Sequence, residues 1–289
     1  MKVIVGGGSG FVGRALVASL LADGADVAVL SRRPSRSSSP GRVIGWEVAG
    51  REIDGADVVV NLAGVSIGGP RWTRGRKAVI LASRVDTTRT LARAVEAARR
   101  RPAVFVTASG IGYYGDAGDD LVDEGSPTGD SFLAHVCADW EAAAAAVPVR
   151  HVAVRTPLVV GPGAPSLRLM ALPFRLFAGG PAGDGRQWFP WVHLEDIVAV
   201  YRRVIEDDSL QGPVNATAPE QLRQREAARD FGSVLHRPAI LPTPAFALRL
   251  LLGEQADLLL HGQRAVSRKL GGLEFRYRGF RAALEDAIG

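Results

Sequence analysis

The first thirteen residues, Met1 to Gly13, read MKVIVGGGSGFVG and decide the fold. A short apolar run rich in β-branched residues covers 2–5, glycines dominate 6–10, and an amphipathic segment begins at Phe11. A strand, a glycine turn and a helix in this order are the context in which a glycine fingerprint indicates dinucleotide binding. We therefore expect this stretch to hold a dinucleotide cofactor.

The glycines fit two spacings, Gly7-x-x-Gly10-x-x-Gly13 and Gly8-x-Gly10-x-x-Gly13. Gly7 or Gly8 would allow the tight turn. Gly10 would let a pyrophosphate approach the backbone, and Gly13 would let the helix pack closely on the strand. The phosphates would then lie at the helix N-terminus, where free N–H groups and the helix dipole favour anions.

The composition is that of an ordinary globular protein with a positive net charge. Of the 289 residues, 47% are hydrophobic and 22% are charged, and the formal net charge is +5. Only three of the 35 basic residues are Lys, and this excess of Arg indicates a GC-rich coding bias rather than a nucleic-acid surface. The single cysteine, Cys137, allows no internal disulfide and fits a reducing cytosol.

The sequence shows neither the pattern of a signal peptide nor that of a membrane span. The early glycines are not those of a signal peptide, and no apolar run approaches the roughly 18 residues of a membrane span. We expect a cytoplasmic protein, a monomer or homodimer, that has neither nucleic acid nor a membrane as a partner. Its partner should be a small-molecule substrate.

Apolar β-branched segments alternate with amphipathic ones over the first 155 residues. We expect strands at 2–5, 26–30, 42–46, 57–61, 103–108 and 149–155, and helices at 11–21, 74–101 and 131–146. This alternation predicts an α/β fold of the Rossmann type, with a doubly wound parallel sheet. Residues 1–160 would form the NADP-binding domain, with 187–217 contributing elements to it. Residues 161–289 would form a smaller, mostly helical substrate-side region that includes the helical segment 236–289.

The end of the second expected strand predicts which cofactor binds. NAD-preferring folds place an acidic residue there, about 20 positions after the glycines, to bind the ribose hydroxyls. This chain has Ser31 and Arg32 instead. An Arg can pair with a 2′-phosphate and a Ser can donate a hydrogen bond to it, whereas a carboxylate would repel it. We therefore expect NADP(H) rather than NAD(H).

Further motifs follow at a regular spacing along nearly the whole chain. They are LSRRP (30–34), NLAG (61–64), RWT (71–73), SRVDTT (83–88), GYYGD (112–116), FLAHVCADWE (132–141), LPFRLFAGGPAGDGRQWFPWVHLED (172–196), GPVNATAP (212–219) and LHRPAILPTPAFALRLLLGE (235–254). In this order the chain resembles the extended short-chain dehydrogenase/reductase superfamily. Within it, the chain is most similar to an atypical epimerase/dehydratase-like group with a C-terminal helical domain of unknown function.

The resemblance implies a set of cofactor contacts. The pyrophosphate would be held by Gly7, Gly10, Phe11, Val12 and Gly13, the 2′-phosphate by Ser31 and Arg32, and the ribose side by Leu62 and Ala63, with Arg84 and Val159 as further contacts. A surface helix cation is the alternative interpretation of Arg84.

The usual catalytic relay of the superfamily does not match this chain. The resemblance implies a Tyr as general acid/base, a Lys four residues later and a Ser or Thr that holds the substrate oxygen. Alignment on Glu141 puts Leu133 at the Tyr position and Cys137 at the Lys position, and the hydroxyl position falls on Gly110. Ser109 is adjacent and is our candidate substitute.

The expected substrate side is aromatic and apolar. Epimerases of this fold carry an Arg-Asp-aromatic run before an HxxD motif, but here that run is Phe-Pro-Trp, 189–191, and Phe189 cannot bind a phosphate. Trp188, Phe189 and Trp191 beside Arg186 predict a hydrophobic pocket with one cation. We expect His193 to cap the helix that follows. No cluster of Cys, His or Asp has metal-ligand spacing, so no metal is expected.

These features leave more than one function open. The first is an NADP(H)-dependent oxidoreductase or isomerase that acts on a small, largely apolar carbonyl substrate, with Tyr114, Ser109 or water handling the proton. The alternative interpretation of Tyr114 is that it packs its loop. The second function is a non-catalytic NADPH-binding or sensing protein, and the third is a nucleotide-sugar epimerase.

Overall fold

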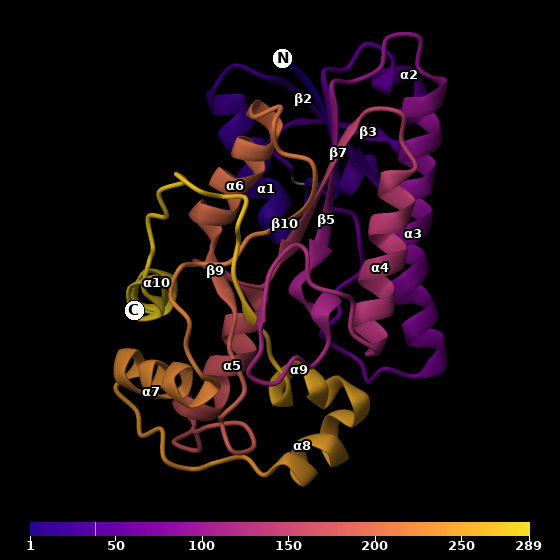
Figure 1. Ribbon diagram of the computed structural model, residues 1–289. Helices are drawn as coiled ribbons and strands as arrows, with labels where there is room; N and C mark the ends of the chain where they lie inside the picture. Colours follow the sequence, from indigo (N-terminus) through magenta and orange to yellow (C-terminus); the bar gives the residue numbers. More distant parts are fainter. Residues whose placement is uncertain (38) are drawn as a thin grey trace.

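In the computed structural model, which describes residues 1–37 and 39–289, seven parallel strands form one sheet (Figure 1). They lie in the order β10-β7-β5-β4-β1-β2-β3. Their bounds are β1 Lys2–Gly6, β2 Asp26–Ser31, β3 Arg42–Gly45, β4 Val58–Asn61, β5 Val104–Gly110, β7 Arg150–Thr156 and β10 Gly212–Asn215. The strand order reverses between β1 and β4. Open α/β sheets bind ligands at the carboxyl ends of the strands beside such a reversal.

Helices cover both faces of the sheet (Figure 1). On one face lie α1 Phe11–Ala22 and α6 Leu194–Glu206, and on the other lie α2 Ala49–Ile53, α3 Arg74–Ala97 and α4 Phe132–Ala145. Alternate strand residues point to opposite faces, so Val3 and Val5 pack in the core under α1 while Ile4 packs in the core under α3. Within the described residues, no helix is both long and apolar enough to cross a bilayer.

A second group of elements lies at the carboxyl ends of the strands (Figure 1). It contains the helices α5 Pro165–Arg175, α7 Gln224–Leu235, α8 Ala245–Leu252, α9 Asp257–Leu260 and α10 Phe280–Ile288. Two strand pairs join it to the rest, β8 Leu158–Val160 with β9 Trp191–His193, and β6 Leu121–Val122 with β11 Arg264–Ala265. Its own core surrounds Phe280, which contacts Trp191, Phe189 and Phe231.

The expected α/β fold of the Rossmann type is confirmed, and each expected strand of the first 155 residues is present within a few positions. Two details of the prediction are wrong. The long helix ends at Ala97 rather than at Arg101, because Arg99 and the backbone N–H of Arg100 bind the carboxylate of Asp54. The segment 236–289 is not helical throughout either.

Residues 261–279 run as an extended strap over the Rossmann core instead of forming a helix. Backbone N–H groups of Arg276 and Tyr277 donate to the carboxylate of Asp196, at 2.7 and 3.1 Å. The Ser267 hydroxyl and the Arg268 N–H donate to Glu124. Buried carboxylates on other elements therefore supply the partners that a helix would otherwise have given this backbone.

Replacing Gly13 by alanine should destabilise the fold, because its Cβ would lie 2.3 Å from the carbonyl oxygen of Gly7. Overpacking against backbone costs about 1–3 kcal/mol, and it outweighs the roughly 1 kcal/mol that alanine gains over glycine in a helix. We expect urea denaturation to show a free energy of unfolding lower by about 2 kcal/mol.

Gly75→Ala is the matched control, since Gly75 lies in α3 with open space around its Cβ position. This variant should be at least as stable as the wild type. Equal stabilities of the two variants would contradict the close packing of α1 on the turn.

Candidate functional site

The turn after β1 is pressed between two other parts of the chain. Gly7 has a φ of 78°, and a Cβ on it would lie 2.6 Å from the carbonyl carbon of Leu62, just beyond β4. The Leu62 N–H donates to the Gly6 carbonyl at 2.8 Å. With Gly13 against Gly7, the turn brings the ends of β1 and β4 and the start of α1 into contact. This is the backbone cradle that the glycine spacing predicts.

The N-terminus of α1 opens at this cradle. Its N-cap residue is Gly10, which has no side chain that could cap the helix. The first turn contains no acidic residue. The Arg14 N–H makes the first intrahelical bond, to the Gly10 carbonyl at 2.9 Å. The N–H groups of Phe11, Val12 and Gly13 precede this first hydrogen bond of the helix, and such N–H groups suit an anion.

The end of β2 lies next to this turn, because Leu30 pairs with Gly6. Ser31 follows, with its hydroxyl accepting a hydrogen bond from the Arg33 N–H at 3.1 Å. Arg32 is exposed and has no ion-pair partner in the part of the chain that the structure describes. A serine hydroxyl and a free guanidinium beside a dinucleotide cradle suit a 2′-phosphate.

The end of β4 is fixed by a buried amide that the sequence did not single out. The Asn61 Oδ1 accepts from the Ala63 N–H at 3.1 Å, and its Nδ2 donates to the Thr88 hydroxyl at 2.8 Å. Trp140 on α4 donates to the same hydroxyl. Asn61 thus ties the predicted contacts Leu62 and Ala63 to two helices. A lone amide at the end of an apolar strand, VVVN, is the signal that marks it.

Arg84 lies inside the wall of this region and is not a surface helix cation. Its Nη1 donates to the carbonyls of Val65 and Ile80, each at 3.1 Å, and its guanidinium stacks on the Trp140 ring at 5.2 Å. Burial lowers the pKa of Arg84. No carboxylate pairs with it among the described residues.

Val159 completes the predicted set from β8, which follows β7 directly. It pairs with Val192 of β9 and packs against the same buried cluster as Val12 and Leu62. The predicted cofactor contacts therefore surround the carboxyl ends of β1, β2 and β4, with Arg84 and Val159 on neighbouring elements.

The candidate Ser109 joins a buried charge pair. Its hydroxyl donates to the Glu141 Oε1 at 2.6 Å. Arg155, only 2% exposed, donates from Nε and Nη2 to the two oxygens of the same carboxylate, both at 2.8 Å. Burial lowers the pKa of Arg155, but the hydrogen bonds and charge of Glu141 outweigh it and raise that pKa above its ordinary value. An arginine within the apolar strand HVAVRT was the signal for this pair.

Tyr114 belongs to the same network. Its hydroxyl accepts from the Arg155 Nη1 at 2.7 Å and donates to the Asn215 Oδ1 at 2.8 Å. The residue is only 4% exposed, and burial raises the pKa of its phenol to about 12. This geometry holds Tyr114 in place by two partners. The neighbouring Tyr113 is half-buried, and its ring lies 3.5 Å from the Arg155 guanidinium.

The positions of the missing relay are occupied by apolar contacts. Leu133 faces the loop after β5. A Cβ added to Gly112 in this loop would lie 3.4 Å from the Cβ of Leu133. Cys137 is buried one turn further along α4, against Gly110. Burial, with the negative charge of Glu141, raises the pKa of the Cys137 thiol to about 11. Neither side chain exchanges a proton at neutral pH.

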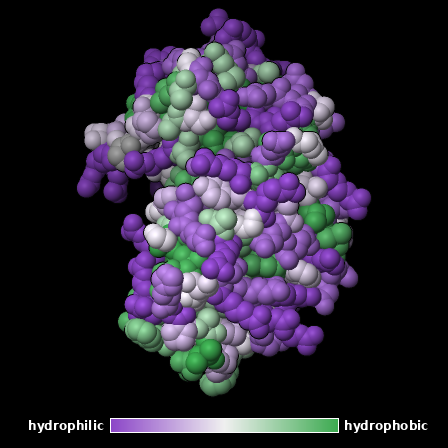
Figure 2. Space-filling view, turned by 90° about the vertical axis from the view of Figure 1, so that its left-hand side faces the viewer, coloured by the Kyte–Doolittle hydropathy of each residue, from purple (hydrophilic) through white to green (hydrophobic). Residues whose placement is uncertain are grey.

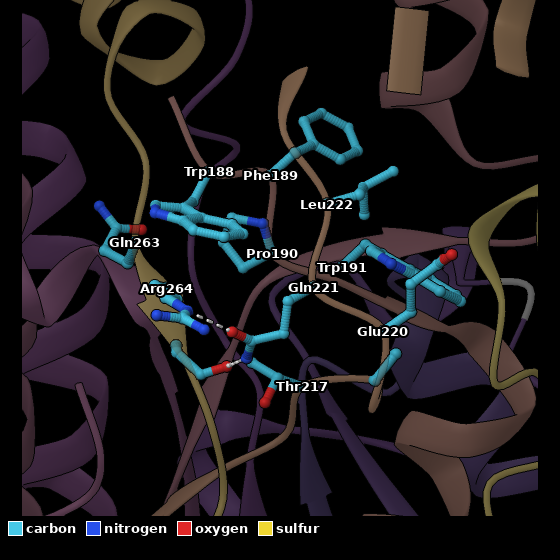
Figure 3. Close-up of a pocket in the computed structure, with 12 residues that line it drawn as sticks. Trp188, Phe189, Pro190, Trp191, Thr217, Glu220, Gln221, Leu222, Gln263 and Arg264 are labelled. Atoms are coloured by element: carbon cyan, nitrogen blue, oxygen red, sulfur yellow. Dashed lines mark hydrogen bonds between the residues drawn. The ribbon is translucent and has the colours of Figure 1, made fainter. Parts of the chain in front are cut away.

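The predicted aromatic pocket takes a different form (Figure 3). Trp188 stacks against the guanidinium groups of Arg223 and Arg264, at 3.7 and 5.0 Å, and not against Arg186. Phe189 and Trp191 instead pack on Phe280 in the core. The cavity that remains measures about 10 Å³, which is about the space that one water molecule needs. Arg223, Arg264 of the C-terminal strap and Phe280 of α10 fill the predicted pocket.

His193 caps α6 as expected. Its Nδ1 accepts from the Glu195 N–H at 3.2 Å, and its Nε2 lies 3.1 Å from the Asp286 carboxylate. Burial lowers the pKa of His193. In residues 1–37 and 39–289, no group of three or more His, Cys, Asp or Glu side chains could hold a metal ion.

A parallel sheet with a glycine turn at its switch point defines a Rossmann-type fold. Residues 3–216 match the NAD dependent epimerase/dehydratase family, and residues 243–287 match a domain of unknown function, DUF1731. The chain belongs to the NAD dependent epimerase/dehydratase family.

Individual relatives match over most or all of their length. The chain is 38% identical over 296 residues to the epimerase family protein SDR39U1 of Mus musculus, with 100% of both chains covered. It is 40% identical over 298 residues to a chloroplastic SDR39U1 homolog of Arabidopsis thaliana, covering 98% of this chain and 86% of the relative. The crystal structure of human SDR39U1 (isoform 2) with NADPH is 37% identical, covers 99% of this chain and 98% of that one, and superposes with a TM-score of 0.91.

Replacing Glu141 by glutamine should destabilise the protein strongly, because Arg155 would keep its buried charge without an anion. Breaking a buried pair in this way costs about 3 kcal/mol or more in the free energy of unfolding. Glu285→Gln is the control, since Glu285 pairs with Arg281 on the exposed surface of α10. Loss of that pair should change stability by less than about 1 kcal/mol in the same urea titration. Similar losses of unfolding free energy in both variants would mean that the Glu141–Arg155 pair is not shielded from water.

Proposed function

We propose that this chain binds NADP(H) across the carboxyl ends of β1, β2 and β4. The observation that carries the proposal is the turn at Gly7, which packs on the backbone of Leu62 just beyond β4 and leads into α1, whose N-cap residue Gly10 has no side chain to bind the first N–H groups. The N–H groups of 11–13 would hold the pyrophosphate. Ser31 and Arg32 would hold the 2′-phosphate, which NADH lacks. The human relative was crystallised with NADPH, which supports the same assignment.

The surroundings of β5 support an oxidoreductase or isomerase for a small, largely apolar carbonyl compound. NADPH, when bound, supplies the hydride for such chemistry. Leu133 lies at the position of the usual acid/base, and Trp72 and Phe132 form a half-buried edge-to-face pair on the adjoining surface, with ring centroids 5.3 Å apart. Apolar side chains of this kind would exclude water and select an apolar substrate.

We assign different roles to the two hydroxyl candidates. Ser109 lies next to Gly110 at the end of β5, and its hydroxyl, which donates to Glu141 in this structure, would turn its proton to hold the substrate oxygen. Tyr114 acts as a positioning residue, because its hydroxyl already has two partners and a pKa near 12. This replaces the sequence-based role of Tyr114 as a proton donor. The proton would come through Ser109 or from water.

A non-catalytic NADPH-binding or sensing role is the second candidate. It is favoured by Leu133 and Cys137, which put apolar contact where the superfamily places its proton relay. A nucleotide-sugar epimerase is a weaker candidate. The Phe189 ring packs on Phe280 at 5.3 Å, so this position offers no cation to a sugar diphosphate.

The wild type should bind NADPH more tightly than NADH, and Arg32→Ala should remove most of the difference. A charge-assisted contact of about 1.5–3 kcal/mol corresponds to a loss of roughly ten- to hundredfold in NADPH affinity. The Kd for NADH should change by less than about threefold. Titration calorimetry with both cofactors measures this.

Arg36→Ala provides the matched control, because Arg36 is an exposed arginine of the same loop outside the predicted set. Its affinities should equal those of the wild type. A tighter Kd for NADH, or equal losses for both cofactors in Arg32→Ala, would contradict the assignment of the 2′-phosphate.

A panel of aldehydes and ketones should reveal substrate-dependent oxidation of NADPH, followed by its absorbance. We expect Ser109→Ala to lower kcat/KM by at least about tenfold, the cost of one lost hydrogen bond in the transition state. Tyr114→Phe should lower turnover without moving the pH profile, since Tyr114 only positions Arg155. Tight NADPH binding with no turnover across the panel would instead support the sensing role.

A further inference from the structure

Helix α5 is apolar on two faces, and only one of them is covered. Leu167, Ala171 and Phe174 are buried in the core of the C-terminal region. The opposite face exposes Leu169 and Leu176, each to 67%, together with Leu172. Exposed apolar residues spaced by three and four form a continuous stripe along a helix, and such stripes are normally covered.

Helix α8 repeats the pattern with less burial. Leu248 is its buried residue, whereas Phe246 and Leu250, one turn apart, are exposed to 75% and 74%. Leu251 and, before the helix, Ile240 are exposed to a similar extent.

Hydrogen bonds join these two helices into one surface. After α5, Gly179 accepts from the Leu241 N–H at 3.1 Å, and Pro181 accepts from the Thr243 N–H at 2.8 Å. We call the exposed residues of this end the apolar end surface: Leu169, Leu172, Leu176, Phe177, Ile240, Leu241, Phe246, Leu250 and Leu251. Figure 2 shows hydrophobic surface gathered at the lower end of the molecule, where Figure 1 places α5 and α8.

Arginines prevail around this surface, although Asp184 and Asp257 lie just beyond its two segments. Residues 165–183 and 236–252 carry Arg168, Arg175, Arg237 and Arg249, and neither segment contains an Asp or Glu. Arg249 lies 3.8 Å from Asp257, and the guanidinium of Arg237 stacks on the Phe177 ring at 4.6 Å. Arg168 and Arg175 are exposed and form no ion pair within the described residues.

We propose that the apolar end surface docks on the face of an anionic phospholipid bilayer. Its Leu and Phe side chains would enter the boundary of the acyl chains, and the four arginines would contact lipid phosphates. A second copy of the chain fits less well, because a two-fold contact would bring arginines of equal charge together.

We expected no membrane partner because the sequence contains no apolar run long enough to span a bilayer. The apolar end surface is not visible in the sequence, because it forms only when α5 and α8 come together in the fold. The proposal does not depend on the cofactor or on any reaction. It adds an interaction surface to the outer side of the helices at the carboxyl ends of the strands.

Vesicle flotation tests the proposal with the full chain and two lipid mixtures, pure phosphatidylcholine and equal parts of phosphatidylcholine and phosphatidylglycerol. We expect binding to the anionic vesicles to be at least about tenfold stronger than to the neutral ones, and to weaken at high salt. Arg175→Gln with Arg237→Gln should lower it by about tenfold or more. Equal binding to both mixtures, or to neither, would overturn the proposal.

Two double variants test whether vesicle binding depends on the apolar end surface or on exposed apolar residues in general. Phe246→Ser with Leu250→Ser should abolish flotation while leaving Tm and the circular dichroism spectrum unchanged. Val79→Ser with Leu121→Ser, which alters exposed apolar residues outside this surface, should float like the wild type. A wild-type dimer that the first variant dissociates, without vesicle binding, would assign the surface to a second copy and refute the lipid proposal.

Discussion

Two nitrogens of Arg155 donate to the two oxygens of Glu141 inside the protein, and the surrounding site depends on this pair. The carboxylate comes from α4, the guanidinium from β7, and Ser109 of β5 donates to the same carboxylate. Through Tyr114 the network continues to Asn215 on β10. A buried pair of this kind adds little stability over an apolar alternative, but it allows few other arrangements of the elements that hold it. It fixes the carboxyl ends of three neighbouring strands.

This network lies beside Leu133 and Cys137, the two positions at which the superfamily carries its proton relay. Charges that are fully paired and hydrogen-bonded are poor acids and bases, and burial raises the pKa of the Tyr114 phenol to about 12 although the Arg155 charge lowers it. The cofactor half of the site has the opposite character. At the start of α1, the N-cap residue Gly10 offers no side chain to the first N–H groups of the helix, and no acidic residue lies in its first turn. The molecule therefore combines an open cradle for an anion with a closed ionic network beside it.

Local patterns predicted the elements whose partners are near in sequence. The glycine spacing specified the turn because Gly7 and Gly13 contact each other within one β–turn–α unit. The contacts of Arg155 were not predictable in this way, since Asn215 reaches the same network from 60 residues further along the chain. The extended strap at 261–279, within a region expected to be mostly helical, was not predictable for the same reason. Its partners, Glu124 and Asp196, belong to distant segments.

The account claims that NADPH lies on the uncapped start of α1 and that no tyrosine–lysine relay faces it. A crystal structure with bound NADPH tests this most directly. It should show the pyrophosphate on the N–H groups of 11–13, the 2′-phosphate on Ser31 and Arg32, and Ser109 as the hydroxyl nearest the nicotinamide C4. A Tyr or Lys side chain at that carbon, or a cofactor bound away from the Gly7 turn, would contradict the account.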